Sequence, residues 1–70
     1  MKKFTILKAE GQEIIECSNT TSMLLEHTDM PINSMCDIYK YMGFNDFQIN
    51  IELNKLNKLT SAKKRGDLVN

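Results

Sequence analysis

The stretch GFNDFQINIELNKLNKL, residues 43–59, fits two secondary structures that exclude each other. Apolar residues that alternate with polar ones predict a half-buried strand, and this pattern holds for Phe47, Ile49, Ile51 and Leu53. Apolar residues spaced by three or four predict an amphipathic helix, and this pattern holds for Ile49, Leu53, Leu56 and Leu59. The backbone state of this stretch decides which fold the whole chain adopts.

Length favours the helix. A strand rarely extends much beyond the seven residues that alternate here, whereas the helical face continues through leucine-rich and lysine-rich sequence of good helix propensity. No proline or glycine interrupts residues 47–65. We therefore predict a third helix that is capped by Asn45 or Asp46 and buries Ile49, Leu53 and Leu56. The alternative is a strand over residues 46–53 followed by a short helix.

The N-terminal third of the chain predicts a β-hairpin. Residues 3–7 and 13–17 are rich in β-branched and aromatic side chains, and they flank a turn that contains Gly11. Phe4 and Ile6 would share one face of the first strand. An isolated hairpin is barely stable, so we expect it to pack on the helices that follow.

Two shorter helices are expected between the hairpin and the third helix. The first covers about residues 20–27, behind a run of possible N-caps at residues 18–21. Pro31 disfavours helical angles at the residue before it and predicts an extended connector over residues 28–33. Asn33 or Ser34 would cap the second helix, which ends at Gly43.

Composition limits the kind of protein this is. The 70 residues form at most one small domain with little room for an enclosed catalytic cleft, so we do not expect an enzyme. Nine basic residues balance nine acidic ones, but the two ends are basic and the middle is acidic. Without a long apolar run, we expect no membrane segment and a cytoplasmic location in which Cys17 and Cys36 are packing thiols. One histidine and no close cysteine pair predict neither a metal site nor a cofactor.

Residues 23–59 resemble the core of winged helix-turn-helix transcription regulators. The matching pieces are SMLLEH, MPIN, SMCDIYKYMG and INIELNKL, with Gly43 and Phe44 in the turn between the second and third helices. The chain departs from the family pattern at Tyr39, where a small residue is usual, and at Ile51, where a polar or basic DNA reader is usual. Residues 60–70 are also too short for a full wing.

The resemblance implies that the third helix enters the major groove of DNA. Asparagine and glutamine can pair with adenine, while lysine and arginine can contact phosphates. The candidate DNA-binding residues are Asn45, Gln48, Asn50, Asn54, Lys55, Lys58, Lys63, Lys64 and Arg65. A solvated helix face and a frayed basic tail explain the same residues without DNA.

Taken together, the sequence predicts an α+β fold in which an N-terminal β-hairpin packs on a three-helix, helix-turn-helix-like core. The expected parts are a hairpin at 3–17, a helical core at 20–60 and a basic C-terminal tail at 61–70. We expect a small DNA-binding transcriptional regulator whose partner is duplex DNA, with a homodimer as its binding form.

The alternative is a protein-interaction module, an adaptor or inhibitor, on the same fold. It is favoured by Asp37, Asp46 and Glu52, because carboxylates near a DNA-facing helix repel phosphates. Tyr41 and Ile51 would anchor its protein partner.

Overall fold

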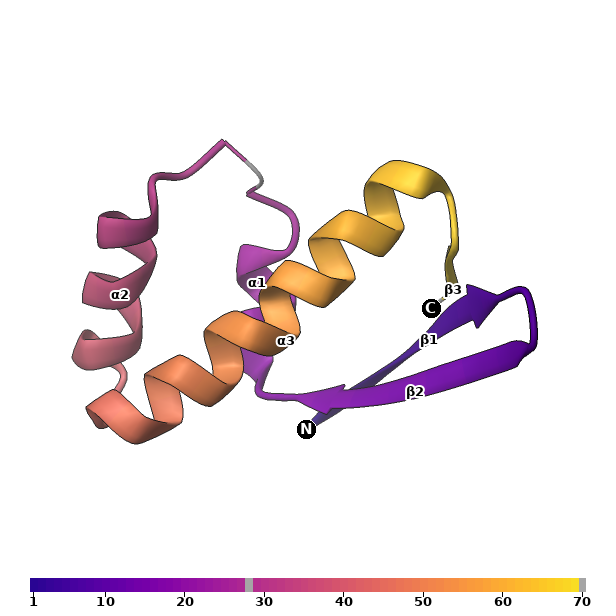
Figure 1. The fold of residues 1–70 in the computed structure, drawn as a ribbon. Helices are drawn as coiled ribbons and strands as arrows, with labels where there is room; N and C mark the ends of the chain where they lie inside the picture. Colours follow the sequence, from indigo (N-terminus) through magenta and orange to yellow (C-terminus); the bar gives the residue numbers. More distant parts are fainter. Residues whose placement is uncertain (28, 70) are drawn as a thin grey trace.

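The computed structural model describes residues 1–27 and 29–69. The element order is two strands, three helices and a short third strand, and it confirms the predicted α+β fold with an N-terminal hairpin. Helix α3 runs diagonally through the middle of the molecule, with α2 on one side and the hairpin on the other (Figure 1).

Strands β1 (Lys2–Lys8) and β2 (Gly11–Cys17) pair antiparallel along their whole length. The turn is sharp because Gly11 adopts φ 139°, which L side chains rarely adopt. Phe4 and Ile6 face the core as predicted, together with Ile15 and Cys17 of β2. The hairpin thus has one apolar face that must be covered.

Helices α1 (Asn19–Leu24) and α2 (Ile32–Tyr41) begin and end at different residues from those predicted. Helix α1 is shorter than residues 20–27 because its last turn tightens, with the His27 N–H donating to the Leu24 carbonyl three residues back. Neither Asn33 nor Ser34 caps α2. Pro31 is the N-cap, with φ −62° and ψ 150°, and its carbonyl accepts from the Met35 N–H. Part of the predicted connector, Thr28, lies outside the described residues.

Helix α3 (Asp46–Arg65) settles the ambiguity of residues 47–53 in favour of the helix. Asn45 and Gln48 form a capping box at its start, and Gly66 ends it in the left-handed conformation with φ 79°. Its predicted buried face is partly wrong. Leu53 is only half-buried, and the buried side chains are Ile49, Glu52, Leu56, Leu59 and Ala62.

Residues 61–69 are folded and do not form the predicted basic tail. Residues 61–65 complete α3, and strand β3 (Leu68–Val69) pairs with β1 to give a sheet of order β2-β1-β3. The Leu7 N–H also donates to the Asp67 carbonyl at 2.8 Å. The chain end therefore covers one edge of the hairpin, and β2 forms the opposite edge of the sheet.

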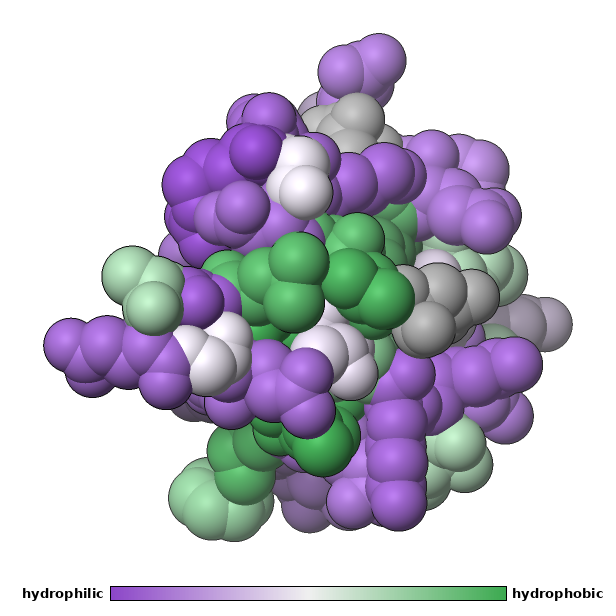
Figure 2. All heavy atoms as spheres, turned by 90° about the vertical axis from the view of Figure 1, so that its right-hand side faces the viewer, coloured by the Kyte–Doolittle hydropathy of each residue, from purple (hydrophilic) through white to green (hydrophobic). Residues whose placement is uncertain are grey.

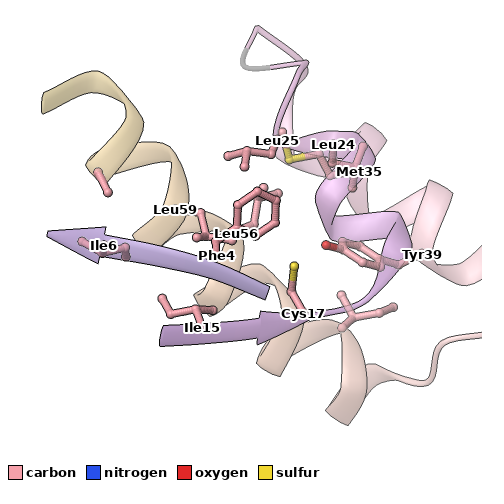
Figure 3. Close-up of a cluster of buried hydrophobic side chains, with 12 residues drawn as sticks. Phe4, Ile6, Ile15, Cys17, Leu24, Leu25, Met35, Tyr39, Leu56 and Leu59 are labelled. Carbon is pink, nitrogen blue, oxygen red and sulfur yellow. The ribbon is translucent and has the colours of Figure 1, made fainter. Parts of the chain in front are cut away.

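The core lies between the inner face of the sheet and the three helices (Figure 3). Leu56 and Leu59 of α3 meet Phe4 and Ile15 of the sheet, while α1 and α2 add further buried side chains, which are Leu24, Leu25, Met35 and Tyr39. Tyr39 is fully buried and packs edge-on against Phe44 with ring centroids 5.1 Å apart. Cys17 is buried and Cys36 packs against the core, as expected of packing thiols.

Hydrophobic atoms also reach the surface. Figure 2 looks at the right-hand side of Figure 1 and shows a hydrophobic patch surrounded by polar atoms. The exposed apolar side chains of the sheet include Leu7, Ile14 and Val69.

Candidate nucleic-acid interface

Helix α3 forms a ridge between two grooves. One groove of about 480 Å³ lies between α3 and β2, and the other, of about 350 Å³, lies between α3 and α2. Asn54 lines both of them, so it stands near the crest of the ridge. A helix that protrudes between two grooves is suited to enter a groove of DNA, because the neighbouring elements leave room on both sides.

The crest consists of amides and one hydroxyl. Asn50, Asn54, Asn57 and Ser61 are exposed and follow one another at spacings of four, three and four, which places them on one face of the helix. Phe47, 73% exposed, precedes this row. Lys58, Lys64 and Arg65 are exposed toward the C-terminal end of the same helix. The surface therefore combines hydrogen-bonding groups with nearby positive charge.

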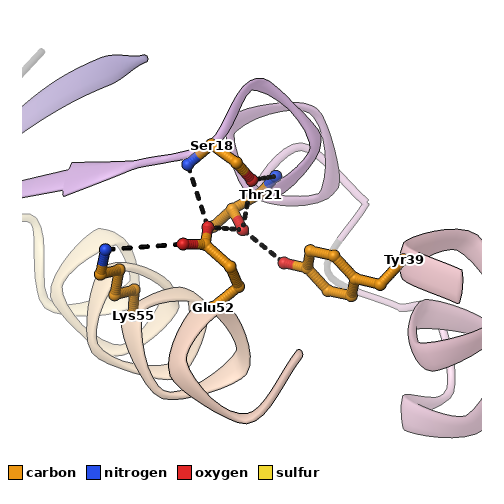
Figure 4. Close-up of polar contacts among 5 residues, drawn as sticks. All are labelled: Ser18, Thr21, Tyr39, Glu52 and Lys55. Atoms are coloured by element: carbon orange, nitrogen blue, oxygen red, sulfur yellow. Dashed lines mark hydrogen bonds and ion pairs between the residues drawn. The ribbon is translucent and has the colours of Figure 1, made fainter. Parts of the chain in front are cut away.

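Glu52 is the functional surprise, because it points into the protein. Its side chain is buried, and Oε1 accepts hydrogen bonds from the Ser18 backbone N–H at 2.9 Å and from the Thr21 hydroxyl at 2.7 Å (Figure 4). The Thr21 hydroxyl is also bonded to the Tyr39 hydroxyl, and Lys55 Nζ lies 3.5 Å from Glu52 Oε2. This network joins α1, α2 and α3 through one carboxylate.

Electrostatics fixes the state of this carboxylate. Burial by itself raises the pKa of Glu52, but the hydrogen bonds from Ser18 and Thr21 and the charge of Lys55 outweigh it, so the pKa lies below its ordinary value. Glu52 is therefore ionised at neutral pH, with its charge compensated inside the fold. The sequence-based argument that Glu52 repels DNA is wrong, because the carboxylate does not lie on the outer face of α3.

Two predicted DNA-binding residues are used at the start of the helix. The Asn45 side-chain oxygen accepts from the Gln48 N–H at 2.8 Å, and the Gln48 side-chain oxygen accepts from the Asn45 N–H at 3.0 Å. These reciprocal bonds stabilise the first turn of α3. The structure thus separates Asn45 and Gln48 from the row of amides that includes Asn50 and Asn54.

The predicted basic residues fall into two groups. Lys55 is half-buried beside Glu52, and Lys63 Nζ donates to the Leu25 carbonyl at 3.3 Å. The others have exposed side chains: Lys58 lies 3.3 Å from Glu13, and Arg65 lies 2.9 Å from Asp67. Lys64 is exposed as well. Exposed ion pairs are weak and exchange readily for a phosphate, so Lys58, Lys64 and Arg65 are the more available cations.

Sequence reasoning did not single out Asn57 and Ser61. Their signal was present in the sequence, because Asn57 lies seven residues and Ser61 eleven residues after Asn50, and both spacings return to the same helix face. The same rule could have found Glu52, which lies three residues after Ile49 and four before Leu56. Its charge argued for the surface, where most glutamates lie.

The two residues predicted for a protein interface lie in different surroundings. Tyr41 ends α2 and is 90% exposed, near Met42 in sequence. Ile51 is 38% exposed and lines the groove between α3 and β2.

Reactive groups are few in the part of the chain that the structure describes. Burial, followed by the nearby charge of Glu52, raises the pKa of the Cys17 thiol, which keeps it protonated and poorly nucleophilic. Residues 1–27 and 29–69 contain no group of three or more His, Cys, Asp or Glu side chains placed to hold a metal ion. Across the same residues, every helix is too short or too polar to cross a membrane.

No protein-family model matches the chain, and neither does a curated protein or a solved structure. The functional argument therefore rests on the residues of this chain.

Proposed function

We propose that this protein is a small non-enzymatic regulator of transcription that binds duplex DNA through the outer face of α3. The observation that supports the proposal is the inward orientation of Glu52. With it buried, the outer face from Asn50 to Arg65 consists of amides, a hydroxyl and cations. The other acid of α3, Asp46, lies in the first turn, ahead of this face.

The dimensions fit a major groove. An α-helix with side chains is about 10–12 Å wide and the major groove about 12 Å. The row from Asn50 to Ser61 rises about 16 Å along the helix, which corresponds to about five base pairs. Asparagine can donate to adenine N7 and accept from its N6 amino group, so Asn50, Asn54 and Asn57 would read bases. Lys58, Lys64 and Arg65 would then hold phosphates.

A single module of this size makes few base contacts. We therefore propose that it acts as a homodimer on two half-sites about one helical turn of DNA apart. The same symmetry would double the phosphate contacts and steepen the salt dependence of binding.

Fluorescence titration of labelled duplex DNA at two salt concentrations tests the proposal. Duplexes are first selected from a random pool by the wild-type protein. We expect the double variant Asn50→Ala, Asn54→Ala to lose preference for the selected sequence. The double variant Lys64→Ala, Arg65→Ala should weaken binding to all duplexes and lower the salt slope by about 2, one unit for each phosphate contact.

The matched control is Lys3→Ala, which also removes an exposed lysine charge but lies on the sheet, in a strand whose next residue, Phe4, faces the core. It should leave the affinity and the salt slope almost unchanged. Absence of binding to every duplex at low salt, with all proteins folded, would refute the proposal.

A second candidate is a protein-interaction module, and one observation favours it. Tyr41, Met42 and Phe47 are 90%, 58% and 73% exposed around the turn between α2 and α3. Clustered exposed aromatic and methionine side chains are typical of protein interfaces. This candidate predicts that a partner is retained after nuclease treatment and lost in Tyr41→Asp or Ile51→Asp, whereas Asn54→Ala has no effect on it.

A further inference from the structure

Strand β2 is an edge strand without the usual protection. It is as long as β1, and the pairing continues from Lys2 with Cys17 to Lys8 with Gly11 without a bulge. It contains neither proline nor lysine, the residues that commonly prevent a new strand from pairing with an edge. Among the described residues, no strand pairs with β2 on the side away from β1.

The exposed edge opens into the groove between β2 and α3. Ile15 and Cys17 face α3 from the strand, while Ile14 and Glu16 face the other side of the sheet. Helix α3 runs antiparallel to β2, because Glu52 contacts Ser18 at one end and Lys58 contacts Glu13 at the other. The wall of the groove therefore presents Ile51, Lys55 and Lys58 in order along the strand.

The two lysines of the groove are loosely held. Glu13 Oε1 is 2.7 Å from Lys8 Nζ, whereas its Oε2 is 3.3 Å from Lys58 Nζ. Glu52 Oε1 accepts from Thr21 and Ser18 at 2.7 and 2.9 Å, whereas Lys55 Nζ is 3.5 Å from Oε2. Each carboxylate thus keeps a closer partner, and both ammonium groups can bind a further anion.

We propose that an extended segment of another protein adds to the sheet as a strand along β2, with its inward side chains against α3. A strand advances about 6.6 Å over two residues, and α3 advances about 6 Å from Ile51 to Lys55. Successive inward side chains of the segment therefore meet Ile51 first and then the space between Lys55 and Lys58. The backbone hydrogen bonds give affinity, and these alternate positions give specificity.

The surroundings of the edge define the segment. Opposite Cys17 and beside Ile51 an apolar side chain fits, and two residues later, opposite Ile15, a carboxylate lies between Lys55 and Lys58. The residue between them faces outward beside Glu16 and is basic, and the next faces outward beside Ile14 and is apolar. The partner is thus a strand of the pattern apolar, basic, acidic, apolar, paired antiparallel to β2.

The probe is a labelled synthetic peptide of the pattern threonine, valine, lysine, glutamate, valine, threonine. The control peptide has lysine in place of the glutamate. Anisotropy gives the affinities, and amide hydrogen exchange of the full chain locates the site. We expect protection of outward-facing β2 amides by the first peptide and affinity about tenfold lower for the second.

Charge reversal in the protein sharpens the test. Lys58→Glu should remove the preference for the acidic peptide, whereas Lys64→Glu, the same change on α3 outside this groove, should keep it. Absence of binding, protection of amides outside β2, or an equal preference in both variants would overturn the proposal. Self-association of the chain through β2 would also overturn it, because the occupant of the edge would then be a second copy.

Discussion

The two faces of α3 use polar residues in opposite ways. On the inner face, Glu52 is buried among leucines, and its hydrogen bonds come from Ser18 and Thr21 of the same protein. On the outer face, Asn50, Asn54 and Asn57 are exposed to solvent. Helix propensity differs little between the two sets, so burial and the source of the partners make the difference. The inner face should therefore determine stability, and the outer face should determine binding.

The largest effect is expected for Leu59→Ala. Leu59 is fully buried against the sheet, so the substitution leaves a cavity and should lower the free energy of unfolding by about 2–5 kcal/mol. Urea denaturation measures this value. Leu53→Ala, at a half-buried position, should cost clearly less. Equal losses would mean that α3 is rotated from the orientation described here.

Glu52→Ala tests the polar part of the inner face. It leaves the Ser18 N–H and the Thr21 hydroxyl without their acceptor and should cost about 1–3 kcal/mol. Glu52→Gln should cost less, because the amide oxygen can still accept both bonds. If both variants are as stable as the wild type in urea denaturation, the network is not a stabilising joint.

The pH dependence of stability isolates the charge of Glu52. Its pKa in the folded state lies below the ordinary value of 4.5, so the carboxylate stabilises the fold above that pH. This contribution is lost as the pH falls from 4.5 through the lower pKa of the folded state. Denaturation between neutral pH and pH about 3 should show a shallower loss for Glu52→Gln than for the wild type.

Glu13 provides the control for that measurement. Its pKa is also lowered, by Lys8 and then by Lys58, but its ion pairs lie at the surface. High salt should therefore suppress the contribution of Glu13 more than that of Glu52. Parallel acid profiles for the wild type and Glu52→Gln would contradict the buried network.

The smallest effect on stability is expected on the outer face. Asn54→Ala removes an exposed side chain and improves helix propensity, so the free energy of unfolding should change by no more than about 0.5 kcal/mol. Thermal and urea denaturation measure it. A large loss would show that Asn54 has a structural role and would remove the distinction between the two faces.

Much of the local structure could be predicted from the sequence. The hairpin follows from Gly11 between two β-rich runs, the break before α2 follows from Pro31, and the start of α3 follows from the Asn45 cap. Residues close in the chain supply the hydrogen bonds and steric limits of these features, so nearby sequence is sufficient to indicate them. The candidate site was predicted in part, with Asn50 and Asn54 on its crest but Asn45 and Gln48 in the cap.

The sequence by itself determined that residues 46–59 are helical, because a seven-residue alternation could not account for the apolar spacing that continues to Leu59. Only the tertiary structure decided that Glu52 is inside. Its partners Ser18 and Thr21 are 34 and 31 residues away in the chain, and burial of a carboxylate is favourable only where such donors meet it. The same long-range contacts rotate α3 so that Leu53 is half-buried and the asparagines form its crest. They also place β3 on one edge of the sheet, and β2 keeps the other edge.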